Sequence, residues 1–242
     1  MKKITLFFLM IGMTALFSSC DLLQQAAEPG VSDDDIALGL KEALDVGISN
    51  GVQDLIKTDG YFANQAIKIL LPDEVSEATN LITQAVPSSD ALLTEAVLKM
   101  NRAAEDAANE AAPIFKDAIT GMTFTDARNI LFGAKNAATE FLKANTYTQL
   151  QGLYAPKINT SLSKVGLPQL WSEIATPYND YANGIIGQAL GAKPIPSDLG
   201  TYVTGKALDG LFFKVQEEEA KIRDNVSARV TDLLQKVFGL LG

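Results

Sequence analysis

The stretch "MNRAAEDAANEAAPIF", residues 100–115, decides the fold class, because its apolar residues recur at the spacing of an α-helix. At about 100° per residue, Ala104, Ala107 and Phe115 fall on one side of a helix. Charged residues such as Arg102 fall on the opposite side. Small alanines on the inner side allow a neighbouring helix to approach closely. The stretch therefore predicts an amphipathic helix inside a helical protein.

Asn101 and Glu105 fit this pattern less well, because they lie on the boundary of the apolar side. If a neighbouring element covers that flank, the amide and the carboxylate need hydrogen-bond partners. Arg102 can serve one of them, although an ordinary helical pair with Asp106 also accounts for Arg102. Two interpretations stay open. The cluster is a structural contact between elements, which we favour, or it is a binding or catalytic site.

The first half of the chain predicts four helices, because alanine and leucine abound and alternating strand patterns are missing. Ser32 and the three aspartates after it predict the start of a first helix, which ends near Gly60. We expect a short helix over residues 62–70 and another over residues 73–86. A long helix then begins near Ser88, is kinked by Pro113 and ends at Gly121.

The second half also predicts helices, interrupted where proline or glycine occurs. Thr123 or Thr125 caps a helix over residues 126–134, and the next helix ends near Pro156. A further helix is interrupted at Pro177. After a loop over residues 191–200, one long helix reaches the C-terminus, with Glu219 and Arg223 as an exposed pair in the favourable order. The fold class is all-α, a single multi-helix bundle-like domain over residues 32–242.

The N-terminus has the layout of an export signal, with Lys2 and Lys3 before an apolar stretch that is short for a bilayer-spanning helix. The motif "LFSSC" resembles a bacterial lipobox, which implies cleavage before Cys20 and lipidation of Cys20, including palmitate. We therefore expect a signal peptide over residues 1–19 and a lipidated tether over residues 20–31. An ordinary signal peptide with a chance cysteine is the alternative. A lone cysteine cannot form an intramolecular disulfide, which favours lipidation.

The charge of the chain constrains its partners. The full chain has 20 basic and 29 acidic residues, net −9, and losing Lys2 and Lys3 leaves 18 against 29, net −11. Nucleic acid and anionic lipid headgroups repel such a protein. We expect no nucleic-acid partner, and we expect a lipid anchor to hold the protein at the membrane. The predicted location is the bacterial cell envelope, with the membrane and leaflet left open.

The order of several longer stretches resembles a known family. They are "SDDDIALGLKEALDVGISNGV", "DGYFANQAIKILLP", "MNRAAEDAANEAAPIF", "MTFTDARNILFG" and "AATEFL". The chain is thereby identified as similar to an uncharacterised bacterial lipoprotein family, domain of unknown function 4197. The resemblance implies an exported, mostly helical domain without established activity, catalytic residues or cofactors. One departure is Phe141, where the family commonly has a tyrosine.

Several kinds of catalysis are excluded or disfavoured by the residues present. The chain has no histidine, which removes the usual general base and the commonest transition-metal ligand. The triplet Asp33–Asp35 is typical of a helix start rather than of an ion site. Ser161 and Lys164 have Ser-x-x-Lys spacing without the partner motifs of a serine acyltransferase. We predict no metal, no cofactor and no catalytic residue.

Three functions remain, in order of preference. The first is a non-enzymatic envelope module that binds a protein partner. The second is a carrier of a small apolar ligand, a lipid or isoprenoid, between its helices. The third is an enzyme with Glu105 as base, contacts from Asn101 and Arg102, and Asp126 or Thr139 nearby. These five residues are the candidate binding or structural cluster.

Overall fold

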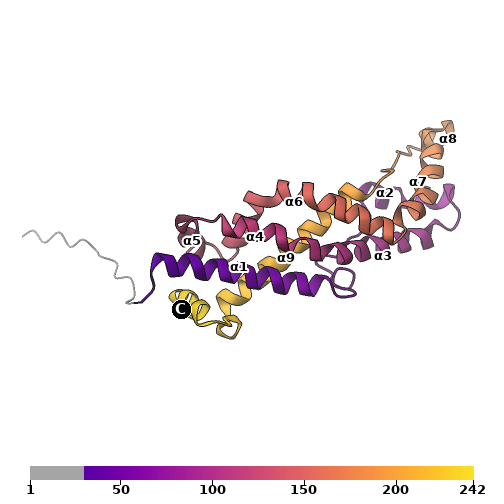
Figure 1. The fold of residues 1–242 in the computed structure, drawn as a ribbon. Helices are drawn as coiled ribbons and strands as arrows, with labels where there is room; N and C mark the ends of the chain where they lie inside the picture. The colour runs from indigo at the N-terminus through magenta and orange to yellow at the C-terminus, as the bar shows by residue number, and fades with distance from the viewer. Residues whose placement is uncertain (1–29) are drawn as a thin grey trace, which may run out of the picture. The chain divides into compact units, whose positions relative to one another are not determined.

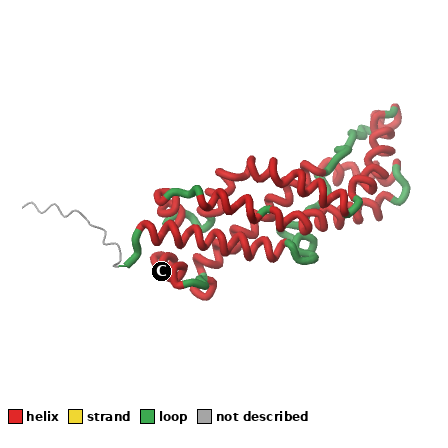
Figure 2. The backbone as a smooth tube through the Cα atoms, viewed as in Figure 1, coloured by secondary structure: helices red, strands yellow, loops and turns green. Residues whose placement is uncertain are grey.

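The computed structural model describes residues 30–242, and within them it contains ten α-helices, three 3-10 turns and no strand (Figures 1 and 2). The prediction of an all-α fold is confirmed. The expected signal peptide, Cys20 and most of the expected tether lie outside the described residues. The helices are α1 (Asp33–Leu55), α2 (Asp73–Ala85), α3 (Ser89–Ala107), α4 (Ala112–Thr120), α5 (Phe124–Leu131), α6 (Ala137–Lys164), α7 (Leu167–Asn183), α8 (Ile185–Ala189), α9 (Gly200–Asp224) and α10 (Asp232–Phe238).

The long helices α1, α3, α6 and α9 run along the molecule, with α9 packed against α1 and α6 (Figure 1). Helix α9 buries an apolar stripe that includes Val203, Leu211 and Val215. Gly39 of α1 lies where α1 packs against α10, and an added Cβ there would lie 2.6 Å from the Val237 side chain. A residue without a side chain therefore permits this close approach. None of the helices described between residues 30 and 242 is long and apolar enough to cross a membrane.

Two helix starts follow from local sequence. Ser32 accepts a hydrogen bond from the backbone N–H of Asp35, and the Asp35 carboxylate accepts one from the Ser32 N–H. Thr123 and Asp126 make the same reciprocal pair at the start of α5. Each capping box satisfies N–H groups that the helix itself leaves without partners. Thr123, rather than Thr125, is therefore the cap.

Three helix boundaries differ from the prediction. Residues 62–70 form turns instead of a helix, because side chains of α3 bind their backbone groups. The long element of residues 88–121 breaks at a 3-10 turn over Ala108–Glu110, and Pro113 then occupies the first turn of α4, where proline is tolerated. The C-terminal helix stops at Asp224, and the chain turns before α10 begins at Asp232.

The predicted breaks at Pro156 and Pro177 are wrong, since α6 and α7 continue through both residues. A proline removes one helical hydrogen bond, but buried neighbours on both sides hold the helix in place. Tyr154 and Ile158 flank Pro156 in the core, and Tyr178 directly follows Pro177 in the core. Tertiary packing therefore outweighs the local preference at both positions.

Candidate functional site

Asn101 lies in the middle of α3 with 0% of its side chain exposed. Its Oδ1 accepts a hydrogen bond from the backbone N–H of Ile69 at 2.9 Å, and its Nδ2 donates to the Ile69 carbonyl at 2.8 Å. Nδ2 also donates to the Val97 carbonyl, one helical turn earlier, at 2.7 Å. The amide thus binds both backbone groups of one residue in the segment between α1 and α2. We call residues 59–71 the clamped segment.

Glu105 binds the other end of the clamped segment. Its Oε1 accepts hydrogen bonds from the backbone N–H groups of Tyr61 and Phe62, each at 3.2 Å. Its Oε2 accepts from Arg102 Nη1 at 2.6 Å, and Arg102 Nη2 reaches Asp59 at 2.6 Å. These two carboxylates, that of Glu105 first, raise the pKa of the Arg102 guanidinium. Arg102 is therefore held between α3 and the clamped segment.

The expected pair of Arg102 with Asp106 does not form. Asp106 instead accepts hydrogen bonds from Ser161 Oγ at 2.6 Å and Lys164 Nζ at 2.9 Å, both on α6. Those two contacts lower the pKa of the Asp106 carboxyl, that of Lys164 most. They also place Ser161 and Lys164, the residues with Ser-x-x-Lys spacing, in a contact between two helices.

Tyr61 completes the attachment of the clamped segment. Its ring is fully buried, and its hydroxyl donates to the Ala207 carbonyl of α9 at 2.8 Å. Burial raises the pKa of Tyr61 well above its usual value. An added Cβ on Gly210 would lie 2.5 Å from the Tyr61 ring, so the glycine leaves the room that the ring occupies. The clamped segment is therefore fixed to α3 at one side and to α9 at the other.

The bonding of Asn101 and Glu105 favours the structural interpretation of these residues. Both oxygens of Glu105 and both polar atoms of Asn101 hold backbone or side-chain groups of the chain itself. A general base needs a free oxygen within hydrogen-bond reach of a substrate proton. Glu105 is 5% exposed and both of its oxygens are occupied, so its chemistry here is that of an acceptor for buried N–H groups.

Asp126 and Thr139 belong to other contacts. Asp126 caps the start of α5 with Thr123, and no hydrogen bond joins it to Asn101, Arg102 or Glu105. Thr139 lies in the first turn of α6, where its N–H and hydroxyl both donate to Glu219 at 2.8 Å. The structure therefore joins Asn101, Arg102 and Glu105, and assigns the other two predicted residues to two separate helix starts.

Glu219 and Arg223 form a buried polar cluster that the sequence did not predict. They were expected to be an exposed pair, but their side chains are 6% and 5% exposed. Glu219 accepts the N–H groups of Ala138 and Thr139 at the start of α6, at 2.9 and 2.8 Å. A carboxylate at this position also compensates the positive end of the α6 dipole.

Arg223 binds carbonyl groups at the C-terminal end of a helix. Its two terminal nitrogens donate to the carbonyls of Ile130 and Leu131 at 2.9 Å, at the end of α5, and its Nε donates to Glu219 at 3.0 Å. Arg229 donates to the carbonyls at the end of α9. The cluster thus joins the end of α5, the start of α6 and the end of α9. The sequence signals this cluster only by the four-residue spacing of Glu219 and Arg223, and exposed helical ion pairs have the same spacing.

The surface near the clamped segment is hollowed, while the core between α1 and α9 is closely packed. A groove of about 490 Å³ is bounded by the clamped segment, the start of α2 and α9, including Leu70, Tyr202 and Phe213. By contrast, the cavity lined by Leu40 of α1 and Val215 of α9 has about 10 Å³, which is room for about one water molecule. Ligand-sized space in this region therefore lies at the surface.

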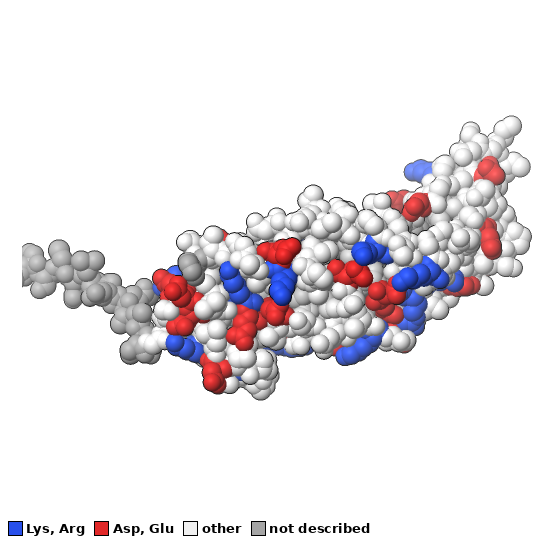
Figure 3. Space-filling model, in the orientation of Figure 1, with Lys and Arg blue, Asp and Glu red and all other residues white. Residues whose placement is uncertain are grey.

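Helix α8 forms an exposed apolar tip. Ile185, Ile186 and Leu190 are 90%, 69% and 57% exposed. The twelve residues 181–192, "YANGIIGQALGA", contain no charged side chain. Figure 3 shows the outermost part of this tip without charged atoms on the face in view, while separate groups of charged side chains lie along the body. We call Ile185, Ile186 and Leu190 the α8 tip.

The described residues thus define an all-α domain whose predicted polar residues are engaged in contacts within the chain, and whose α8 tip exposes apolar side chains at one end. The family model for a protein of unknown function, DUF4197, matches residues 30–239. The chain belongs to this family. No curated protein and no solved structure matches the chain.

Proposed function

We propose that this protein is a lipid-anchored, non-enzymatic component of the bacterial cell envelope that binds a protein partner through the α8 tip. The single observation that carries the proposal is the exposure of three large apolar side chains, two on the short helix α8 and one directly after it. Isolated exposed apolar residues are normal, but a contiguous group marks an interaction surface. The lipobox motif at Cys20 supports the anchor.

Contacts with the end of α7 hold the α8 tip in place. Gly187 packs against α7 so closely that an added Cβ would lie 2.2 Å from the Tyr181 carbonyl. The side chain of Gln188 donates to the Asn183 carbonyl at 2.8 Å, which holds α8 on the end of α7. These contacts direct Ile185 and Ile186 away from the protein. A partner pocket that buries both side chains gains about 1.5–3 kcal/mol for each, so the tip supplies part of the binding free energy and further contacts supply the rest.

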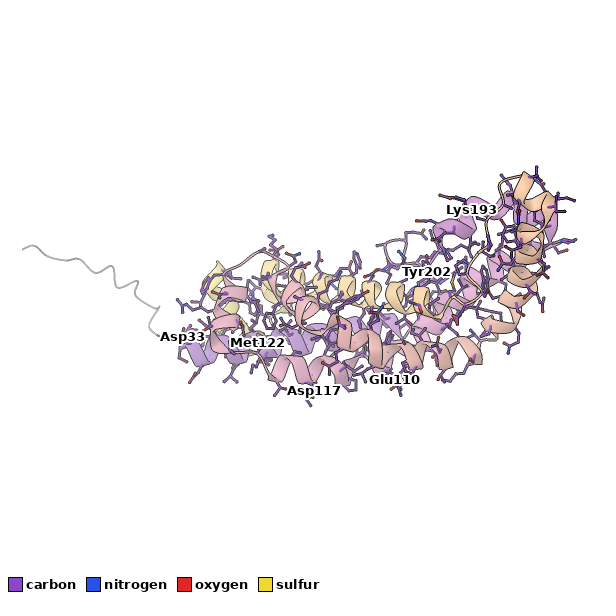
Figure 4. All side chains as sticks on the ribbon, turned by 90° about the horizontal axis from the view of Figure 1, so that it is seen from above. Asp33, Glu110, Asp117, Met122, Lys193 and Tyr202 are labelled. Carbon is purple, nitrogen blue, oxygen red and sulfur yellow. The ribbon has the colours of Figure 1, made fainter. Side chains whose placement is uncertain are left out.

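The position of the tip favours a protein partner over the anchoring membrane. Asp33, at the start of α1, lies at the opposite end of the described domain from α8 (Figures 1 and 4). A tether over residues 20–31 spans at most about 40 Å when extended. The tether joins the domain at the Asp33 end, so the tip lies at the end of the domain remote from the point of attachment. The acidic body also repels anionic lipid headgroups.

The carrier function has less support. The cavity between α1 and α9 holds about 10 Å³, so a lipid placed there would require these helices to separate. The polar residues proposed for an enzyme are occupied by contacts within the chain. Both observations favour the interaction module.

Site-specific photo-crosslinking in intact cells of the host tests the proposal. A photoreactive residue replaces Ile186 in the full-length protein, and a matched control carries it at Thr148, an exposed position on α6. We expect one discrete protein adduct from position 186, none from position 148, and loss of the adduct when Ile185→Ser is added. Equal labelling from both positions, or an adduct with lipid alone, would refute a protein partner at the tip.

A further inference from the structure

A groove of about 330 Å³ lies between α2, α7 and the loop before α9, at the end of the domain that carries Lys193 (Figure 4). Its size falls in the range of small-molecule sites. Its lining combines charged and apolar side chains with a buried tyrosine. The lining residues are Glu74, Glu77, Ala78, Leu81, Tyr178, Gly191, Lys193 and Pro194.

The loop wall of the groove is fixed to α7. The side-chain amide of Asn179 accepts from the Ile195 N–H at 2.8 Å and donates to the Ile195 carbonyl at 3.0 Å. The indole N–H of Trp171 donates to the Pro196 carbonyl at 2.8 Å. Three hydrogen bonds from side chains of one helix hold the loop in place. The groove is therefore preformed, which lowers the entropic cost of binding a ligand.

Tyr178 is fully buried and lines the groove, and its hydroxyl proton has no hydrogen-bond acceptor in the protein. Burial raises the pKa of Tyr178, and the nearby backbone N–H of Lys193 lowers it in part, so the hydroxyl lies beside the loop wall. An unpaired buried hydroxyl costs about 1–3 kcal/mol. The hydroxyls of Ser89 and Tyr154 also lack partners, but neither residue lines this groove.

Three charged side chains line the same groove. Glu74 and Glu77 are three residues apart on α2, so their carboxylates share one face of the helix. Lys193 lies on the loop opposite α2. Among the described residues, none of these three has an ion-pair partner within 4.0 Å, whereas twelve other ion pairs form. The groove therefore offers two free carboxylates, one free ammonium and one unused hydroxyl.

We propose that this groove binds a small basic amino acid, a molecule with two ammonium groups and one carboxylate. Its two ammonium groups match the two carboxylates of the groove, and its carboxylate matches the ammonium of Lys193. Glu74 and Glu77 accept hydrogen bonds from its ammonium groups, while Lys193 and the Tyr178 hydroxyl donate to its carboxylate. The aliphatic chain of the ligand packs on Ala78, Leu81 and Pro194. This site is independent of the α8 tip and goes beyond the proposed function.

Titration calorimetry of the full chain, purified in mild detergent, tests the site with L-lysine as the probe. We expect saturable binding of L-lysine, at least tenfold weaker binding of L-norleucine, which lacks the second amine, and no binding of L-glutamate. Glu77→Gln should weaken L-lysine binding at least tenfold. Glu173→Gln, an exposed glutamate of α7 outside the groove, is the matched control and should leave binding unchanged.

Tyr178→Phe separates a ligand contact from a structural role. Since the hydroxyl has no partner in the free protein, its removal should leave the melting temperature of the free protein unchanged or raised. The same variant should lose at least tenfold in affinity for L-lysine. The proposal is overturned by an absence of binding at 10 mM L-lysine (on the order of the weakest useful affinity), by equal binding of L-norleucine, or by full affinity in Tyr178→Phe.

Discussion

Replacing Asn101 by alanine tests the role of the clamped segment. The amide satisfies the N–H and the carbonyl of Ile69, and Asn101 is completely buried, so the variant leaves two backbone groups without partners. Each unsatisfied buried group costs about 1–3 kcal/mol, so the two groups together give a loss of about 2–6 kcal/mol. The lost bond to the Val97 carbonyl matters less, because this carbonyl remains in the α3 helix. For a domain of this size, 1 kcal/mol lowers the melting temperature by about 2–4 °C.

Urea unfolding followed by circular dichroism measures this loss, with native-state hydrogen exchange as a local readout. We expect the unfolding midpoint to fall with an unchanged slope, and the amide of Ile69 to exchange faster. Asn145→Ala is the matched control, because Asn145 is exposed on α6 and its amide donates only to the Phe141 carbonyl. The control should change stability by less than about 0.5 kcal/mol. If Asn101→Ala stays within the same limit, the segment is not held as described.

Three further predictions concern helix ends and packing. Arg223→Met should destabilise the protein by about 3–5 kcal/mol in urea unfolding, because Glu219 is left buried without its cation; a loss below 1 kcal/mol would contradict the buried cluster. Gly210→Ala should cost about 1–3 kcal/mol, because its Cβ would meet the Tyr61 ring, whereas Gly205→Ala on the same helix has open space and should be neutral or stabilising. The Ser32 N–H, more than any other group, holds the pKa of Asp35 at about 2, below the usual 3.8. The ionised Asp35 carboxylate therefore stabilises the protein above pH 4, and this stabilisation is lost as the pH falls toward 2. The difference in melting temperature between the wild type and Asp35→Asn should shrink over that range.

The sequence predicted the fold class because helix formation here follows from local spacing. The capping boxes at Ser32 and Thr123 are visible in the sequence, since each needs only residues three positions apart. The boundaries at residues 62–70 and at Pro156 were wrong, because each depends on contacts between distant segments. Asn101 lies 32 residues from Ile69 in the sequence, and no local pattern shows that it binds that backbone.

The candidate site was predicted in part for the same reason. The position of Asn101 and Glu105 at the edge of an apolar face indicated that they would need partners, but it did not indicate which segment supplies them. Glu219 and Arg223 were assigned to the surface, since spacing alone does not distinguish an exposed pair from a buried one. The sequence did not predict the α8 tip, because "GIIGQAL" is short and only the fold shows that nothing within the described residues covers it.

We propose the α8 tip, rather than the Asn101 cluster, as the functional surface. The most direct test is the yield of the crosslinked protein adduct from position 186 in two backgrounds, measured below the melting temperature of each variant. Glu105→Gln weakens the contacts of Glu105 with the clamped segment, and we expect its adduct yield to equal that of the parent. Ile185→Ser should retain stability, since Ile185 is 90% exposed, and should lose the adduct. A full yield in Ile185→Ser, or a loss confined to Glu105→Gln, would contradict the account.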